Sequence, residues 1–552
     1  MRDAYASRCP ILKPCGLGAR YSFFFQLIKR LFSDNWGNNK PLHRLCSLVR
    51  KMGVTALTIE DLIPNQEILN EQADLQRFHQ RPVRTRARRV SFFRTTSRDW
   101  RGIPDREFLG YAVVLVHRLG RRKPLAHILE AVVREPAIFL RAQNGVLYPE
   151  TVGNYYPHCV REFKSAVGTR DDHKEFRVRG AFFCQQNGRT HVCAHAALRM
   201  AVNSSPTLAL RRKLTNRRIN DLLGIDHVTR RADDGLSSQQ IQKVVSRLNR
   251  RCHTADFNER PRVDYAAFVY PLVESRLPVI LGIEGPSEPH VVAVLGHTVN
   301  SDRWAPEARQ GYGCLPMSQH MSSAAWADHF IINDDNYGMS ITLPAETVQN
   351  FLVPQFNPNL HAAMAIGIVP PRVRIHGYLA EQSAARIAFG IVNAISPAPR
   401  NTWLVYLQDL IREALKAMRS GRSPTRTIVC RTLLLDRDGY ARHLGVTTDS
   451  DANALTEAEK RDLRKRLPRI FWLTEISLPD LYTANKHKLG DIVSSANPTR
   501  RHIETGASIV FCWLPGLAIM RKEGRLRSFP WSLTGHIPLI RHGGGQVPAL
   551  EW

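Results

Sequence analysis

The chain of 552 residues is longer than one hydrophobic core usually needs, so two or three domains are expected. Its 43% hydrophobic and 23% charged residues indicate that most of it folds, which argues against a disordered protein. The 77 Lys and Arg residues against 49 Asp and Glu residues leave a net charge of +28. That charge predicts attraction to nucleic acid, anionic surfaces or acidic protein partners, without selecting among them.

The distribution of cysteine and apolar residues bears on where the protein works. The ten cysteines lack the short paired spacings of a disulfide scaffold or a zinc ribbon, which favours a reducing, cytoplasmic location. The first 32 residues lack the pattern of a signal peptide. The longest apolar run, residues 506–520, is too short to span a bilayer and contains Pro515 and Gly516, so it predicts a buried strand and turn. No transmembrane anchor is expected.

In chain order, the residue patterns divide the sequence into four parts. Residues 1–75 mix short helical patterns with turn residues and are assigned no function. Residues 76–166 are a basic region with β-strands, and residues 167–351 are a domain of mixed helix and strand. Residues 352–552 are a C-terminal α+β region of unknown role.

The stretch between residues 81 and 94 is rich in arginine and also contains Phe92 and Phe93. Interleaved Arg and Phe suit nucleic-acid binding, since rings stack on bases and guanidinium groups contact phosphates. No recognisable nucleic-acid motif accompanies the stretch, so the favoured interpretation is a basic edge strand whose aromatic side chains turn inward. Further basic stretches, at residues 211–218 and 460–469, could hold the same kinds of partner.

The central region begins with a polar loop that leads into an alanine-rich helix opened by Cys193. A second helix is expected near residues 236–248, with Ser237 or Ser238 as its N-cap. Short β-branched runs bounded by Gly, Pro and Asp then predict buried strands. These runs are residues 278–283, 290–296 and 330–333.

The C-terminal region predicts two helices followed by two strands. The helical patterns cover residues 380–395 and 402–418, and the strand patterns cover residues 427–435 and 469–476. Glu475 lies within the second strand pattern. It is interpreted as a surface-facing strand residue in preference to a catalytic carboxylate.

Cys193 is the first candidate for chemistry, because a thiol at a helix N-terminus lies near unpaired N–H groups that favour the thiolate. A cysteine acyl-transfer site also needs a histidine, a group that orients it, and donors for the oxyanion. His290 begins a strand, and Asp334 ends the next strong strand between Asn333 and Asp335. Gln185 or Gln186 could donate an amide N–H beside the backbone N–H of Cys193.

This order of residues resembles the papain-like cysteine peptidases, especially the bacteriocin-processing (double-glycine leader) peptidases and their stand-alone relatives. The similar stretch covers about residues 181–338. The resemblance implies an α+β fold with a papain-like core, in which a helix bears Cys193 and an antiparallel sheet bears His290 and Asp334, with α/β extensions at both ends. It also implies a peptidase or isopeptidase without a cofactor, with Cys193 as nucleophile, His290 as general base and acid, Asp334 as orienting carboxylate and Gln186 as oxyanion donor.

The chain departs from the family pattern at two places. Asp335 follows Asp334 where the leader peptidases usually have proline, so Asn333, Asp334 and Asp335 all stay open as the orienting residue. Residues 301–328 are an apparent insertion between the histidine and the acid. No Walker-type phosphate loop follows, which argues against an exporter.

Several alternatives stay open. His297 ends the same strand as His290, but the odd offset places the two on opposite faces of a regular strand. A zinc site formed by Cys184, His191 and His195 lacks a usual ligand spacing. The same triad could perform transglutaminase-like acyl transfer. A catalytically inactive protein that binds nucleic acid or an acidic partner through its basic surface is the other alternative.

Overall fold

The computed structural model has an α+β fold whose sheets are almost entirely antiparallel. The chain forms two compact units, the first made of residues 1–249, 278–295 and 331–343, and the second of the remaining residues. The domain boundaries expected after residues 75, 166 and 351 stay predictions. The structure describes residues 5–15, 39–120, 124–134, 138–143, 146–151, 155–187, 193–208, 210, 212–226, 228, 235–258, 263–284, 289–298, 320–327, 329–345, 361–395, 402–422, 424, 426–446, 457–482, 487–498, 508–522, 525–530 and 537–540.

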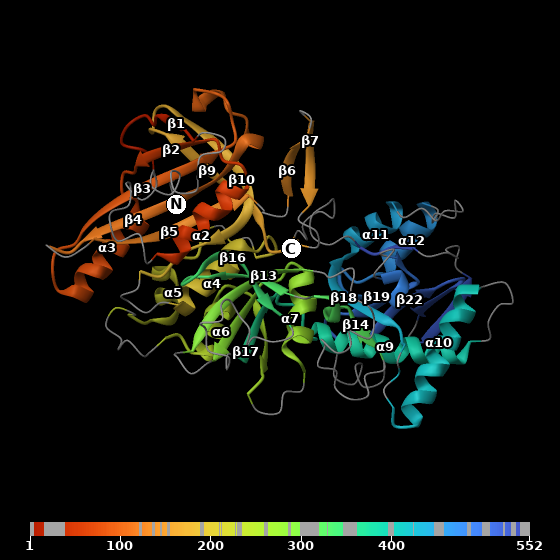
Figure 1. The fold of residues 1–552 in the computed structure, drawn as a ribbon. Coiled ribbons are helices and arrows are strands. Elements are labelled where there is room, and N and C mark those ends of the chain that lie inside the picture. The colour runs from red at the N-terminus through yellow and green to blue at the C-terminus, as the bar shows by residue number, and fades with distance from the viewer. Residues whose placement is uncertain are drawn as a thin grey trace. The chain divides into compact units, whose positions relative to one another are not determined.

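The first unit contains a large antiparallel sheet with the strand order β1-β2-β3-β4-β5-β10-β9 (Figure 1). Helix α2 (Lys40–Lys51) packs on β5, and helix α3 (Gln66–His79) packs on β3. The rings of Phe93 on β3, Phe108 on β4 and Phe176 on β10 contact one another in the core. The strands are Leu12–Pro14 (β1), Ala56–Asp61 (β2), Arg84–Phe93 (β3), Phe108–Arg118 (β4), Leu125–Arg134 (β5), Arg161–Gly168 (β9) and His173–Phe183 (β10).

Strand β3 carries the arginine-rich stretch, and the expectation of an edge strand is wrong. β3 pairs with β2 on one side and with β4 on the other, so it lies inside the sheet. Phe92 and Phe93 are buried, as expected. The arginines are accommodated because β2 ends in acidic residues at the matching register: Arg86 and Arg88 pair with Asp61, and Arg89 pairs with Glu60.

The first unit also contains the helices α4, α5 and α6, and the strands β12, β13, β15 and β16, which lie side by side in that order. Of the two expected N-cap residues of α6, Ser237 is the N-cap. Its side-chain oxygen accepts the backbone N–H of Gln240, and its own backbone N–H donates to the side-chain oxygen of Gln240. The elements are Cys193–Ser204 (α4), Asn216–Leu223 (α5), Ser238–Arg247 (α6), Val279–Glu284 (β12), His290–Thr298 (β13), His329–Asp334 (β15) and Gly338–Pro344 (β16).

The second unit is built on another sheet, in the order β14-β18-β19-β21-β22-β23-β24, with helices on both faces. Because strand side chains alternate between faces, Cys512 packs with helices α9 and α10, whereas its neighbours Phe511 and Trp513 pack with α11 and α12. The elements are Met321–Ser322 (β14), Gly377–Ala394 (α9), Thr402–Arg419 (α10), Val429–Asp436 (β18), Arg437–Val446 (α11), Glu457–Arg466 (α12), Ile470–Ser477 (β19), Gly490–Ser495 (β21), Ile509–Leu514 (β22), Leu517–Lys522 (β23) and Arg525–Pro530 (β24).

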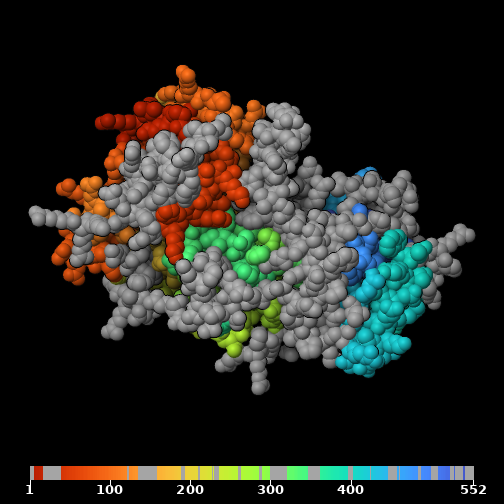
Figure 2. All heavy atoms as spheres, viewed as in Figure 1, coloured from red at the N-terminus to blue at the C-terminus, as the bar shows by residue number. Residues whose placement is uncertain are grey.

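Several C-terminal expectations are confirmed. The run from residue 506 to 520 contains β22 and the first part of β23, and a turn at Gly516, with a φ of 75°, joins the two strands. The amphipathic helix α10 buries Leu407 and Ile411 and exposes Tyr406, and Figure 2 shows atoms of this region, in cyan, at the surface.

No helix in the described part of the chain is long and apolar enough to cross a membrane.

The remaining short elements complete the two units. In the first unit these are Trp100–Gly102 (η2), Asp105–Glu107 (η3), Ile138–Gln143 (β6), Val146–Thr151 (β7) and Tyr155–Pro157 (β8). In the second unit they are Arg251–Asp256 (β11), Tyr265–Glu274 (α7), Ser323–Trp326 (η4), His361–Val369 (β17), His487–Lys488 (β20) and Ile537–Pro538 (β25).

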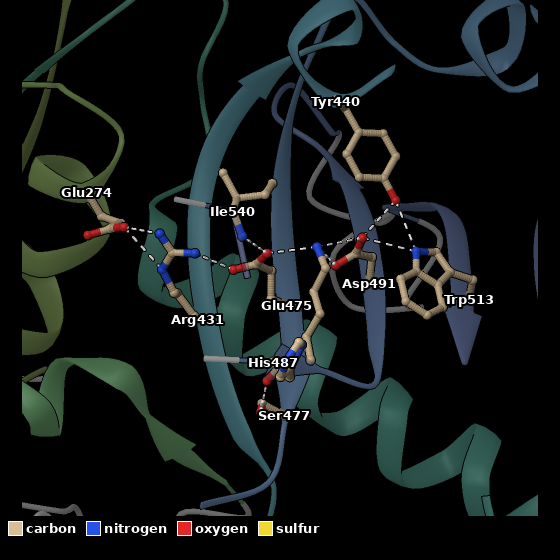
Figure 3. A network of polar contacts seen from close by, with 10 residues as sticks. Glu274, Arg431, Tyr440, Glu475, Ser477, His487, Asp491, Trp513 and Ile540 are labelled. Atoms are coloured by element: carbon tan, nitrogen blue, oxygen red, sulfur yellow. Dashed lines mark hydrogen bonds and ion pairs between the residues drawn. The ribbon is translucent and has the colours of Figure 1, made fainter. Parts of the chain in front are cut away.

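Glu475 does not face solvent, so the expectation of a surface residue is wrong. Its side chain is fully buried and contacts Arg431 on one side and Lys488, at 2.7 Å, on the other (Figure 3). Arg431 also pairs with Glu274, and Lys488 also pairs with Asp491. These side chains are at most 1% exposed, so a substrate has no access to them, and the network is structural.

Candidate active site

The start of α4 positions the candidate nucleophile. α4 begins at Cys193, which is partly exposed, and the helix packs against β10 and β12. By contrast, Cys184 is fully buried, its Sγ lies 3.7 Å from the carbonyl oxygen of Ala196, and burial raises its pKa to about 12. Cys193 is therefore the better placed of the two thiols for chemistry.

Side chains from α4 and β15 hold the end of β10 in place. The N–H of Phe182 donates to Ser204 Oγ at 2.9 Å, and Asn333 Nδ2 donates to the Phe182 carbonyl oxygen at 3.0 Å. The other end of the Asn333 amide accepts the N–H of Ser340 at 2.9 Å. Asn333 is thus occupied with the backbone, which removes it as the group that orients His290.

Asp334 contacts the candidate base. Its Oδ1 lies 3.2 Å from Nε2 of His290, whereas Oδ1 of Asp335 lies 3.6 Å from the same nitrogen. Oδ1 of Asp334 also accepts the backbone N–H groups of Asn336 at 2.8 Å and Tyr337 at 3.1 Å. These bonds fix the carboxylate at the start of the turn between β15 and β16, so Asp334 is the better placed orienting residue.

The environment of His290 favours its protonated form. Burial lowers the pKa of the imidazole, but the hydrogen bond to Asp334 and the charges of Asp334 and Asp335 outweigh this effect and raise the pKa to about 9. The His290 side chain is 22% exposed, so it is still open to a substrate. At neutral pH the site therefore holds an imidazolium, the partner that stabilises a thiolate.

Asp335 is a buried carboxyl group beside this pair. Burial and the charge of Asp334 raise its pKa to about 7, against the opposing effect of His290. No other described residue donates a hydrogen bond to the carboxyl oxygens of Asp335, and only the backbone N–H of Asp335 itself acts to lower the pKa in this way. His290, Asp334 and Asp335 each offer a ligand atom, all within 4.8 Å of one another, so this group could also hold a metal ion.

Gln186, and not Gln185, is linked to His290 through Asn336. Gln186 Nε2 donates to Asn336 Oδ1 at 2.7 Å, and Asn336 Nδ2 lies 3.5 Å from Nδ1 of His290. The amide oxygen of Gln185 instead accepts the N–H of Ile128 at 3.1 Å inside the sheet. Asn336 was missed by the sequence reasoning, although its place in a short turn directly after Asp334 could have indicated it.

Three of the four predicted residues, Gln186, His290 and Asp334, are thus joined by direct contacts and by Asn336. Cys193 is connected to this group through its helix. α4 packs against β12, and β12 pairs with β13, where Ile283 lies opposite His290. Residues 188–192, which lead into Cys193, lie outside the described part. The catalytic roles of the four residues stay predictions.

The rival residues have other partners. His297 Nε2 lies 2.5 Å from Oε2 of Glu274, and its side chain is fully buried. His195 Nε2 lies 2.9 Å from Oδ1 of Asn220. His191, the third residue of the zinc alternative, lies outside the described residues.

Comparisons with protein-family models, with curated proteins and with solved structures found no match for this chain.

Proposed function

We propose that the protein is a cysteine-dependent hydrolase that cleaves peptide or isopeptide bonds, with a papain-like core formed by α4 and the strands β12, β13, β15 and β16. The observation that supports this most is the 3.2 Å contact between His290 on β13 and Asp334 on β15. These strands belong to the sheet whose strand β12 packs against the helix opened by Cys193. The Gln186 amide, held at His290 by Asn336, supports it further.

In the proposed reaction, each group has one task. Because Nε2 of His290 faces Asp334, Nδ1 is the nitrogen that exchanges a proton with Cys193. The thiolate attacks the substrate carbonyl, and the second N–H of the Gln186 amide, with the backbone N–H of Cys193, stabilises the oxyanion. His290 then protonates the leaving amine as the C–N bond breaks, and water releases the acyl group from Cys193.

The test is the reactivity of Cys193 toward a thiol probe that carries a peptide carbonyl. We expect the probe to label Cys193 in the folded protein faster than Cys252 or Cys430, because burial raises the pKa of Cys252 to about 12 and raises the pKa of Cys430 well above its usual value. Labelled sites are read by mass spectrometry of the digested protein. Cys193→Ala should abolish the fast labelling, and Cys252→Ala, the matched control, should leave it intact.

The opposite results are equally clear. Labelling of Cys193 that is no faster than that of Cys252 would overturn the proposal. A Cys193→Ala variant that keeps its hydrolytic activity would also overturn it. If a chelator then abolished that activity, the chemistry would be assigned to a metal ion bound by His290, Asp334 and Asp335. A product formed with an added amine in place of water would show the transglutaminase-like alternative.

Binding of nucleic acid or an acidic partner stays a prediction from net charge. The arginines of β3 are largely paired with Asp61 and Glu60, and in α12 Arg464 pairs with Asp438, which reduces the unpaired charge of both stretches. A binding protein of this kind would lose affinity steeply as salt is added.

A further inference from the structure

The first unit contains a pocket of about 240 Å³ that the predicted catalytic residues do not line. It lies between helix α3 and strands β4, β5, β9 and β10, and the loop before α5 contributes Arg212 and Lys213. One wall is aromatic: the ring centres of Phe163 and Phe182 lie 6.3 Å apart, with an angle of 28° between the ring planes. A second wall is basic, and its charges decide what the pocket can hold.

Most of the charges at this pocket are compensated by a carboxylate. Glu67 binds Arg199 at 2.7 Å and Lys213 at 3.0 Å, and Lys213 also pairs with Glu130. Two further cations at the pocket have partners outside it: Arg89 pairs with Glu60, and Lys164 pairs with Glu175. The paired groups therefore add no net charge to the pocket.

Arg161 and Arg212 are the exceptions. In the described part of the chain, neither pairs with a carboxylate. Arg212 is exposed, but Arg161 is partly buried, with its guanidinium 4.6 Å from the ring centre of Phe163 and its buried Nε without a hydrogen-bond partner. Burial lowers the pKa of Arg161, which reflects the cost of leaving this cation without an anion.

We propose that this pocket binds a small organic anion, a carboxylate or phosphate group attached to a flat apolar part. Arg161 is the anchor, because its planar fork of N–H groups matches a carboxylate or phosphate and its charge has no carboxylate partner among the residues that the structure describes. Arg212, at the rim, is close enough to the same pocket to add a second positive charge. Phe163, whose ring is partly exposed, supplies the surface for the flat apolar part, and the buried ring of Phe182 supports it from behind. The proposal does not depend on Cys193.

The experiment is calorimetric titration of the full chain with benzoate and, separately, with phenyl phosphate. We expect saturable binding of at least one probe, and the stronger of the two identifies the acid group. Arg161→Gln should weaken that binding by at least about tenfold, since a hydrogen-bonded charge pair is lost. Arg161→Lys keeps the charge without the fork and should give a smaller loss.

The matched control is Arg177→Gln. Arg177 is an exposed arginine of the neighbouring strand β10, pairs with Glu162 at 3.6 Å and does not line the pocket. This variant should bind the probe as the natural chain does, and so should Cys193→Ala. Circular dichroism confirms that each variant is folded, and Arg161→Lys serves for the comparison if Arg161→Gln does not fold. Absence of saturable binding, or equal losses in the Arg161 and Arg177 variants, would overturn the proposal.

Discussion

At the scale of single residues, the pair of His290 and Asp334 has the clearest physical consequence. A pKa raised from 6.5 to about 9 means that folding stabilises the imidazolium. The stabilisation from this pair is fully present below pH 6.5 and is lost as the pH rises through about 9. Activity that needs His290 as the general acid should decline over the same alkaline range.

Asp334→Asn tests this dependence. Removing the charge and the charged hydrogen bond should lower the pKa of His290 by about 1 to 3 units, because burial then dominates. The alkaline limb of the activity profile should move to lower pH, and turnover should fall about 10²-fold. The imidazole titration can be followed by NMR, with His290→Gln to assign the signal.

Asp335→Asn is the control for that experiment. Asp335 lies further from Nε2, at 3.6 Å, and acts on His290 through charge alone, so its replacement should lower the pKa of His290 less. An equal or larger shift in Asp335→Asn would show that Asp335 is the orienting residue.

At the scale of elements, the end of β10 links the candidate site to its supports. Phe182 donates its N–H to Ser204, the last residue of α4, and accepts from Asn333 in β15. Gln186 follows four residues later and contacts Asn336 in the turn after β15. The helix that carries Cys193 and the strand that carries Asp334 are therefore joined to the same short segment.

Ser204→Ala tests this joint. The buried N–H of Phe182 would lose its partner, which costs about 1–3 kcal/mol in the free energy of unfolding. Urea denaturation measures the loss. Ser246→Ala is the control, because Ser246 is exposed on α6 and its replacement should change the free energy of unfolding by less than about 0.5 kcal/mol. Similar values for both variants would mean that the contact at Phe182 contributes nothing.

At the scale of the whole molecule, both units bury paired charges in their interiors. The second unit contains a buried chain of charges that continues from Lys488 to Asp491, whose carboxylate accepts from Tyr440 at 2.9 Å and Trp513 at 3.0 Å (Figure 3). The backbone N–H of Ile540 also donates to Glu475 at 2.8 Å. A network this complete tolerates the low dielectric of a core because nearly every charge has a partner.

Arg431→Met should therefore destabilise the second unit strongly. It would leave Glu274 and Glu475 short of a buried partner, at a cost of about 3–5 kcal/mol. The control Arg426→Met breaks the exposed pair with Asp480 and should cost about 1 kcal/mol or less. Hydrogen exchange at β18 and β19 measures the change. Equal protection in both variants would contradict a structural role for the network.

Local patterns in the sequence were enough to predict the α+β class and many of the elements. The N-cap at Ser237 and the strand pair around Gly516 depend on neighbouring residues, so the sequence contains the necessary information. The candidates Cys193, His290 and Asp334 also came from sequence, because each stands at the end of a recognisable helix or strand. Their chemistry still awaits the thiol probe.

Only the tertiary structure decided the partners of the polar residues. An alternating pattern tells which residues share a face of a strand, but it does not tell what covers that face. This is why Glu475 was expected at the surface and β3 at an edge, and why Asn333 and Asp334 could not be separated. The position of Arg161 has the same origin, since only the folded chain decides which carboxylates lie near a cation, and none of the described carboxylates pairs with Arg161.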